Sequence, residues 1–372
     1  MGKLAISISV LIFLTTVGIA WARVSGPCSN CHTMHNSQNG QPIDENGPRV
    51  YLLDPVSSFR DACVACHSNE GTETIVVQGS TRIPIVLNLQ EPTYPSDGSS
   101  SGTLAGGNFY WLYANAGVGG ENQSVYGHNV LAIDGVPPDE NLTQAPGKPD
   151  VASGPSCAGC HDRIDRCESC HAPAHHAPDT GPVVGQEGGW YRFLNSSFHG
   201  SENTGVIGIE DSDWEQTVSA SDHNEYMGAN NAYGNDDNSM SNYCAGCHYK
   251  FHGIPNVGED NHSPWFRHPA HLPLPDNPDK EYYYYNNPGG SGPGQYNPLA
   301  PIARDPDQLL SMTEPSPIVT PGSDQVMCIS CHRPHGTPYP DMLRWNYLEG
   351  CVAGQGTPSE CGCYVCHTTK GE

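Results

Sequence analysis

The sequence contains few basic residues. Lysine and arginine together number 16, against 40 aspartate and glutamate residues, which gives a formal net charge of −24 with histidine neutral. A nucleic-acid partner requires clustered basic side chains that neutralise phosphates, and this composition offers no such cluster. We therefore expect no nucleic-acid partner, and we attribute the acidity to solubility outside the cell.

Long apolar runs are also scarce. Only 36% of the residues are hydrophobic, and 42 glycines and 33 prolines interrupt almost every run. After residue 19 no segment is long and apolar enough to cross a membrane, because a spanning helix needs about 20 such residues. Taken alone, this composition leans towards disorder. Something other than side-chain packing must therefore supply the core of the fold.

Residues 1–22 have the features of a secretory signal peptide. Lys3 supplies the positive charge, residues 4–19 carry none, and Ala20-Trp21-Ala22 is a small-x-small cleavage site. An uncleaved anchor is the alternative, but serine and threonine residues interrupt the apolar stretch. Cleavage would leave a mature chain that starts at Arg23 without a membrane span. We expect an exported protein of the periplasm, the outer surface or the extracellular space.

Cysteine, by contrast, is abundant, and 14 of the 16 cysteines form seven copies of the pattern Cys-x-x-Cys-His. This is the attachment signature of haem c, in which two thiols add to the porphyrin vinyl groups and the histidine ligates the iron. The motifs lie at 28–32, 63–67, 157–161, 167–171, 244–248, 328–332 and 363–367. The predicted cofactor is therefore seven copies of haem c. A zinc finger or a thioredoxin-like pair does not require histidine after every second cysteine.

The predicted site residues follow directly from these motifs. The thioether cysteines are Cys28, Cys31, Cys63, Cys66, Cys157, Cys160, Cys167, Cys170, Cys244, Cys247, Cys328, Cys331, Cys363 and Cys366. The proximal iron ligands are His32, His67, His161, His171, His248, His332 and His367.

Two cysteines, Cys351 and Cys361, lie outside the pattern. In an oxidising compartment the simplest interpretation is a disulfide between them. However, Cys361 also forms a Cys-x4-Cys-His pattern with Cys366, in competition with Cys363. We favour Cys363 because its spacing is the commoner one for haem attachment. If Cys361 carried the haem, Cys363 would be the partner of Cys351.

Histidine is plentiful enough to ligate both faces of every iron. Eleven of the 18 histidines lie outside the proximal positions, whereas there are only seven methionines, so we predict bis-histidine haems. The candidate distal ligands are His35, His128, His176, His199, His223, His252, His268 and His335. His175, His262 and His271 are the remaining histidines.

A histidine that follows its own motif by three to five residues cannot easily reach the far face of that motif's haem. We expect it to ligate a neighbouring haem, so that each such motif links two haems. On this argument His35 serves the haem of the 63–67 motif, and His335 serves the haem of the 363–367 motif.

The predicted fold is mostly coil, with short helices at the haem motifs, a small β-rich insertion, and the haems as the core. We divide the mature chain into a two-haem region at 23–150 and a five-haem region at 151–372. The insertion lies in residues 71–150, where TIVVQG, RIPIVLNL and NFYWLYA have the apolar patterns of strands. Residues 275–301 are low in complexity and are predicted to be a loop. Two interpretations of its four consecutive tyrosines stay open. The tyrosines pack on haem or at a partner surface, or they lie in a partly exposed loop.

The segments CSNCHTMHNSQNG and CISCHRPHGTPYPDMLRW resemble the multihaem cytochromes with doubled CxxCH motifs. That group includes outer-surface cytochromes of metal-reducing bacteria, some of which polymerise into conductive filaments. The resemblance implies bis-histidine haems stacked in a chain and electron transfer in the periplasm or across the outer surface.

We therefore predict an electron carrier rather than an enzyme, with redox proteins or extracellular acceptors as partners. One alternative is a multihaem reductase of the nitrite or sulfite type, in which one haem keeps an open axial position. All seven motifs end in histidine, which does not favour this alternative. Another is a filament subunit, in which His35 near the mature N-terminus would ligate a haem of the next protomer.

Overall fold

A computed structural model provides the fold. The structure describes residues 27–30, 32–38, 41–42, 62–95, 102–116, 123–139, 145–147, 166–172, 175–177, 179–187, 189–195, 205–230, 237–248, 251, 268–355 and 360–371. The predicted signal peptide and the 157–161 motif lie outside these residues. Among the described residues, none of the helices has the length and apolar character needed to span a bilayer.

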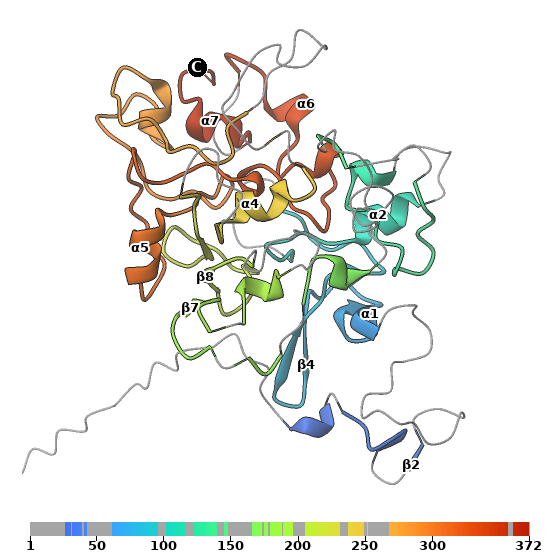
Figure 1. The fold of residues 1–372 in the computed structure, drawn as a ribbon. Helices are drawn as coiled ribbons and strands as arrows, with labels where there is room; N and C mark the ends of the chain where they lie inside the picture. Colours follow the sequence, from blue (N-terminus) through green and yellow to red (C-terminus); the bar gives the residue numbers. More distant parts are fainter. Residues whose placement is uncertain are drawn as a thin grey trace, which may run out of the picture.

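Most of the described chain is coil, joined by short helices and strands (Figure 1). The α-helices are α1 (Ala62–His67), α2 (Tyr110–Asn115), α4 (Met240–Ala245), α5 (Pro306–Ser311), α6 (Tyr347–Gly350) and α7 (Cys363–Cys366). The 3-10 helices are η1 (Cys28–Asn30), η2 (Gln123–Val125), η3 (Cys167–Ser169), η4 (Tyr191–Phe193), η7 (Glu281–Tyr284), η8 (Cys328–Ser330) and η9 (Pro340–Met342). The strands are β1 (Ser37–Gln38), β2 (Gln41–Pro42), β3 (Ser68–Asn69), β4 (Ile75–Gln78), β5 (Thr81–Pro84), β6 (Leu87–Asn88), β7 (Val183–Val184), β8 (Gly208–Ile209) and β9 (Glu225–Tyr226). The prediction of a mostly coil fold with short helices and small strands is confirmed.

The β4–β5 hairpin confirms two of the three predicted strand segments. It is antiparallel, with Gln78 opposite Thr81 across a two-residue turn. Gly79 adopts φ = 65° in this turn, a conformation that glycine allows without a steric penalty. Farther along the second segment, β6 pairs in parallel with β3, directly after the 63–67 motif. The hairpin region is therefore attached to the polypeptide that carries that motif.

The third predicted strand, NFYWLYA, is wrong, because these residues form α2. The Asn108 side-chain oxygen accepts a hydrogen bond from the Tyr110 backbone N–H at 2.9 Å and fixes the first turn. Asn108 also exchanges hydrogen bonds with Asn88, so the start of the helix is tied to β6. Trp111 and Leu112 are buried. A short apolar run does not distinguish a strand from a helix, and here the asparagine contact decides.

Short helices at the motifs were predicted and are confirmed. A helix or 3-10 turn contains the first cysteine in six of the seven motifs, at η1, α1, η3, α4, η8 and α7. The turn brings both cysteines and the histidine to one side of the backbone. Ser239 caps α4, and its side chain accepts a hydrogen bond from the Asn242 backbone N–H.

Apolar packing is divided among several small clusters rather than one core. One cluster joins Val64 and Leu112 to the partly buried Cys167. Another contains Trp345 and Cys361. Several cysteines of the motifs lie at the edges of these clusters, so the apolar packing surrounds the attachment points. The two regions predicted on either side of residue 150 contact each other, because Phe109 stacks on His335.

The predicted loop at 275–301 is coil apart from η7, which contains three of the four consecutive tyrosines. Tyr285 is fully buried, and its hydroxyl donates a hydrogen bond to the Ala300 carbonyl at 2.8 Å. The edge of Tyr282 meets the ring of His367, with the centroids 4.9 Å apart. Part of the tyrosine run therefore packs inside the molecule and next to the last motif.

Candidate haem-binding site

Five of the described motifs are closed by a backbone hydrogen bond. In each of them the N–H of the histidine donates to the carbonyl of the first cysteine, four residues earlier. The distances are 2.8 Å at His32, 2.9 Å at His171 and His248, 3.2 Å at His332 and 2.7 Å at His367. This single turn holds the two thiols and the imidazole together, as attachment to one porphyrin requires.

Hydrogen bonds at Nδ1 fix the orientation of the proximal histidines. Four of them place Nδ1 within hydrogen-bonding distance of a backbone carbonyl: His67 with Pro84 (2.7 Å), His171 with Arg192 (2.9 Å), His248 with Pro146 (2.8 Å) and His332 with Asp341 (2.8 Å). In His367 the Nδ1 partner is the Glu281 carboxylate, at 3.4 Å. An Nδ1–H donor of this kind selects the tautomer in which Nε2 is left for a metal.

Four proximal histidines lie opposite a second histidine from a distant segment. The ring centroids are separated by 6.5 Å in His32 and His176, 6.0 Å in His171 and His335, 6.1 Å in His248 and His128, and 6.2 Å in His367 and His268. Each pair joins one CxxCH histidine to one of the predicted distal ligands. All four pairs therefore have the composition expected of axial ligands.

These separations fit an iron atom between two imidazoles. A metal–imidazole bond of about 2.0 Å and about 1.1 Å from the nitrogen to the ring centre place two axial rings roughly 6.2 Å apart. A direct ring-to-ring contact would be shorter, as it is in the stack of His223 on Tyr296 at 3.6 Å. The residues present fit bis-histidine haem at four of the motifs.

His128 and His335, which we predicted as distal ligands, are half-buried, and their surroundings favour the neutral imidazole. Burial, together with the nearby His248, lowers the pKa of His128 to about 4. Burial likewise lowers the pKa of His335 to about 3. The His128 Nδ1 lies 2.8 Å from the Pro334 carbonyl, so this ring is oriented in the same manner as the histidines of the motifs. A neutral imidazole is the form that binds a metal.

The pairing of His335 differs from our prediction. We expected it to serve the haem of the 363–367 motif, but its ring lies opposite His171, and His268 lies opposite His367. The backbone N–H of His335 donates to the Gly106 carbonyl at 2.7 Å, which turns this segment towards α2. The general expectation that His335 faces a haem other than its own agrees with this geometry.

His223 does not have the geometry of a ligand. Its Nε2 lies 3.1 Å from the Glu225 carboxylate, and its Nδ1 lies 3.1 Å from the Ser219 carbonyl. The side chain is fully buried and stacks on Tyr296. Both nitrogens are thus occupied by protein atoms, and the structure argues against our prediction of a distal ligand here.

Several predicted site residues lie outside the described part of the chain. These are Cys31, Cys157, Cys160, His161, His199 and His252. His35 is described and exposed, in a left-handed backbone conformation with φ = 55°. The roles assigned to these residues stay predictions.

Contacts between motifs show that motifs which follow one another in the described part of the chain are also neighbours in space. Val64 of the second motif packs in the same cluster as Cys167. The Tyr243 hydroxyl, next to the fifth motif, donates to the Cys170 carbonyl. In Figure 1 the order runs from α1 through α4 to α7.

The later motifs continue this order through their own cysteines. Helix α4, which carries Cys244, contacts η8, which carries Cys328, and the proximity of the two thiols raises the pKa of Cys244 and lowers that of Cys328. Cys331 and Cys363 lie at the edge of one apolar cluster. The neighbouring motifs are therefore 63–67, 167–171, 244–248, 328–332 and 363–367, in that order.

Three residues near the rings were not identified from the sequence. Phe109 stacks on His335 with the centroids 4.8 Å apart. Glu281 and Tyr282 both contact His367, from η7. No spacing rule links these residues to their histidines, since the contacts arise only when distant segments fold together. The tyrosine run was the one signal that pointed to this region.

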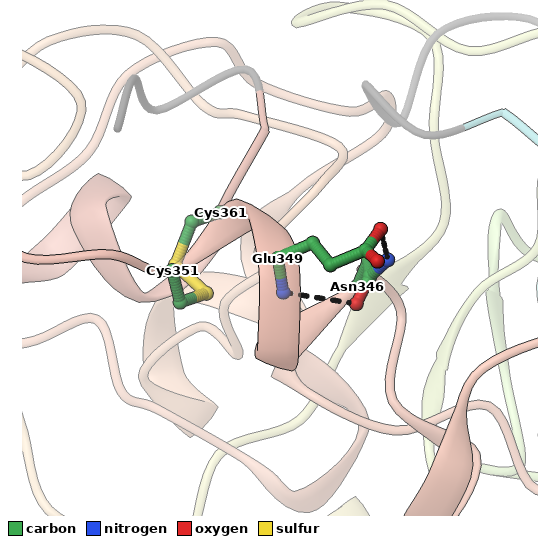
Figure 2. The surroundings of a disulfide bond; sticks show 4 residues. All are labelled: Asn346, Glu349, Cys351 and Cys361. Atoms are coloured by element: carbon green, nitrogen blue, oxygen red, sulfur yellow. Dashed lines mark hydrogen bonds between the residues drawn. A yellow bond between two sulfur atoms is a disulfide. The ribbon is translucent and has the colours of Figure 1, made fainter. Parts of the chain in front are cut away.

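The prediction for the unpaired cysteines is confirmed, because Cys351 and Cys361 form a disulfide (Figure 2). Cys363 is left as a free thiol at the start of α7, together with Cys366 at the other end of that helix. The last motif thus keeps the Cys-x-x-Cys-His pair.

Comparison with known proteins supports the same interpretation. Residues 320–372 match the family model of the doubled CXXCH motif. The chain is 25% identical, over 390 aligned positions, to the C-type cytochrome OmcS of Geobacter sulfurreducens, and the alignment covers 92% of this chain and 85% of OmcS.

Two solved structures from Geobacter sulfurreducens have a similar fold. One is the outer membrane cytochrome S filament, with a TM-score of 0.53 and 20% identity, covering 95% of this chain and 93% of that one. The other is a structure of the OmcS nanowires, with the same score and identity and 94% coverage of both chains. The resemblance to multihaem cytochromes with doubled CxxCH motifs, inferred from the motifs, is confirmed.

Proposed function

We propose that the protein transfers electrons along a series of seven covalently attached haems, each held between two histidines. Haem iron, when bound, supplies a one-electron couple whose potential depends on its axial ligands, hydrogen bonds and burial. The observation that carries the proposal is the opposition of four histidine pairs at 6.0–6.5 Å, each with one CxxCH histidine.

We assign the axial pairs His32/His176, His171/His335, His248/His128 and His367/His268. For His67, His161 and His332 we propose partners among His35, His175, His199 and His252. His223 is left out, because both of its nitrogens have protein partners.

Two histidines at each of these positions close both axial sites. The Nδ1 hydrogen bonds hold the rings in place, so that no small substrate displaces them easily. This arrangement favours an electron carrier over a multihaem reductase, which would need an open iron position.

The contacts between motifs favour transfer along a continuous path. The elements that carry Cys244 and Cys328, α4 and η8, contact each other, and Cys331 and Cys363 share one apolar cluster, so the attachment points of successive motifs lie close together. The path would run through the motifs in the order 63–67, 167–171, 244–248, 328–332 and 363–367. We propose redox proteins or extracellular acceptors as the partners at its ends.

We further propose that the protein is exported and self-associates into filaments. The signal-peptide features at residues 1–22 support export. The fold similarity to a cytochrome filament supports self-association. Negative-stain microscopy of the purified holoprotein over a range of concentrations tests this part. Filaments are the expected result, and monomers at every concentration would overturn it.

The electron-transfer proposal is tested on holoprotein produced in a host that attaches haem c. We expect the intact mass and the pyridine haemochrome assay to give seven haems per chain. The electronic and electron paramagnetic resonance spectra should show only low-spin iron. Addition of nitrite or cyanide should leave the spectra unchanged. A high-spin band that shifts with either anion would overturn the carrier function in favour of a reductase.

A further inference from the structure

The last motif offers two alternative cysteine pairs for one haem. The sequence CGCYVCH contains Cys363-x-x-Cys366-His, and also Cys361-x4-Cys366-His. Each pair includes Cys366 and ends at His367. Attachment at the wrong first cysteine would lengthen the loop between the two thioethers by two residues. A device that distinguishes Cys361 from Cys363 is therefore needed at this motif.

The structure brings three sulfur atoms together at this point. Cys351 and Cys361 form the disulfide, and the Sγ atom of Cys363 lies within 4.8 Å of both of their sulfurs. Cys361 is fully buried, against Trp345 and Tyr364. Cys363 is only partly buried and is the first residue of α7.

Cys351 is held in position by α6 (Figure 2). The Asn346 side chain caps this helix by accepting a hydrogen bond from the Glu349 backbone N–H at 3.2 Å. Gly350, the last residue of α6, lies so close to Glu360 that a Cβ atom would approach the Glu360 carbonyl to 2.6 Å. The backbone thus brings Cys351 beside the segment that leads into Cys361.

We propose that the Cys351–Cys361 disulfide selects the cysteine pair that receives the last haem, which makes Cys351 the residue that determines the attachment register. Haem attachment at this motif is itself part of the function proposed above. A thioether forms when a free thiol adds across a porphyrin vinyl group, so a sulfur held in a disulfide cannot take part. Pairing with Cys351 withdraws Cys361 and leaves Cys363 and Cys366.

The same proximity exposes the motif to thiol–disulfide exchange before the haem is attached. The Cys363 thiolate can attack the Sγ atom of Cys361, which forms a Cys361–Cys363 bond and releases Cys351 as the leaving thiolate. One disulfide breaks and one forms, the proton lost by Cys363 is regained by Cys351, and no external oxidant is needed. Conversion of Cys363 into a thioether ends this exchange and fixes the Cys351–Cys361 pair.

The test uses wild type, Cys351→Ser and Cys351→Ser/Cys361→Ser holoproteins. Free thiols are alkylated under non-reducing conditions, and the peptide from 351 to 371 is mapped by tandem mass spectrometry. In wild type we expect thioethers at Cys363 and Cys366 and no alkylation at Cys361. In Cys351→Ser we expect a substantial fraction with a thioether at Cys361, or with a Cys361–Cys363 disulfide.

The double variant is the matched control, because it lacks the disulfide and also the competitor. We expect its thioethers to return to Cys363 and Cys366 in full. If the double variant accumulates and Cys351→Ser does not, the result would support selection. Both proteins lack the disulfide, and they differ only in whether Cys361 can mispair.

Two results would overturn the proposal. In one, Cys351→Ser carries its haem entirely on Cys363 and Cys366, with Cys361 alkylated. In the other, the double variant fails as badly as the single one, which would make the disulfide purely stabilising. These results differ from those expected if the proposed function itself were wrong. In that case the CxxCH peptides of the wild-type protein would carry no haem.

Discussion

The rings of His128 and His248 lie opposite each other with centroids 6.1 Å apart, and each ring is hydrogen-bonded to a different further segment of the chain. His128 is hydrogen-bonded through Nδ1 to Pro334, and His248 is hydrogen-bonded to Pro146. Four distant segments therefore meet at one place. Because ligation by both rings would join these segments, metal binding and folding are coupled here.

Replacement of His128 by glycine should open one axial position. We expect one high-spin haem per chain and a new band that responds to cyanide, while the other haems stay low-spin. Added imidazole should restore the low-spin spectrum, because it occupies the space left by the side chain. Electron paramagnetic resonance with and without imidazole measures both effects. An unchanged spectrum in this variant would show that His128 is not an axial ligand.

Replacement of His223 by glutamine should change stability but not iron spin state. The imidazole is buried between Glu225 and Ser219, so the variant should lose about 1–3 kcal/mol of unfolding free energy. Thermal unfolding followed by circular dichroism measures the loss, and the spectrum of the native variant should stay low-spin. The exposed Asp222→Asn is the control and should stay within about 0.5 kcal/mol of wild type. A high-spin signal in His223→Gln would restore His223 to the ligand set.

The sequence predicted the attachment chemistry well because that chemistry is local. Two thiols and a histidine must lie within one helical turn, so Cys-x-x-Cys-His is visible in the residue order alone. The short helices at the motifs follow from the same requirement. The β4–β5 hairpin was predictable for a similar reason, because alternating apolar residues and a glycine turn are local signals too.

The distal ligands were predicted as a set but not as pairs. His335 lies close to the last motif in sequence, yet it stands opposite His171. That choice depends on how the 333–337 segment packs on α2 through Gly106 and Phe109, which no spacing rule encodes. The error at NFYWLYA has the same origin, since the contact between Asn108 and Asn88 decides the helix.

Arg304 should be among the most sensitive residues outside the motifs. It is fully buried, and its guanidinium donates two hydrogen bonds to Glu225, at 2.7 and 3.0 Å, and one to Asp324 at 2.9 Å. Replacement by leucine would leave two buried carboxylates without their cation. We expect a loss of about 3–5 kcal/mol in unfolding free energy.

Thermal unfolding of the purified Arg304→Leu holoprotein, or its failure to accumulate, checks this prediction. The matched control is Arg82→Leu, because Arg82 is exposed and donates to a single carbonyl, that of Ser212. The control should stay within about 0.5 kcal/mol of wild type. Equal effects of the two variants would contradict the role of the buried cluster.

Glu281 should lower the potential of the last haem. Its carboxylate is the Nδ1 partner of His367 at 3.4 Å, and it also accepts hydrogen bonds from the Thr369 N–H and hydroxyl. An anionic partner makes the imidazole a stronger electron donor and so favours the oxidised iron. In Glu281→Gln the midpoint potential of one haem should rise, on the order of 60 mV, a tenfold change for a one-electron couple.

Spectroelectrochemical titration, which records the haem absorbance as a function of potential, measures this shift. The part of the absorbance change that one haem contributes should move to higher potential. Glu349→Gln is the matched control, because Glu349 is an exposed carboxylate on α6 whose partner is Asn346 rather than a histidine. Its titration curve should overlay that of wild type. An equal rise in both variants would show that the carboxylate acts only through surface charge, since a specific effect requires the contact with His367. A fall in potential for Glu281→Gln would contradict the predicted effect altogether.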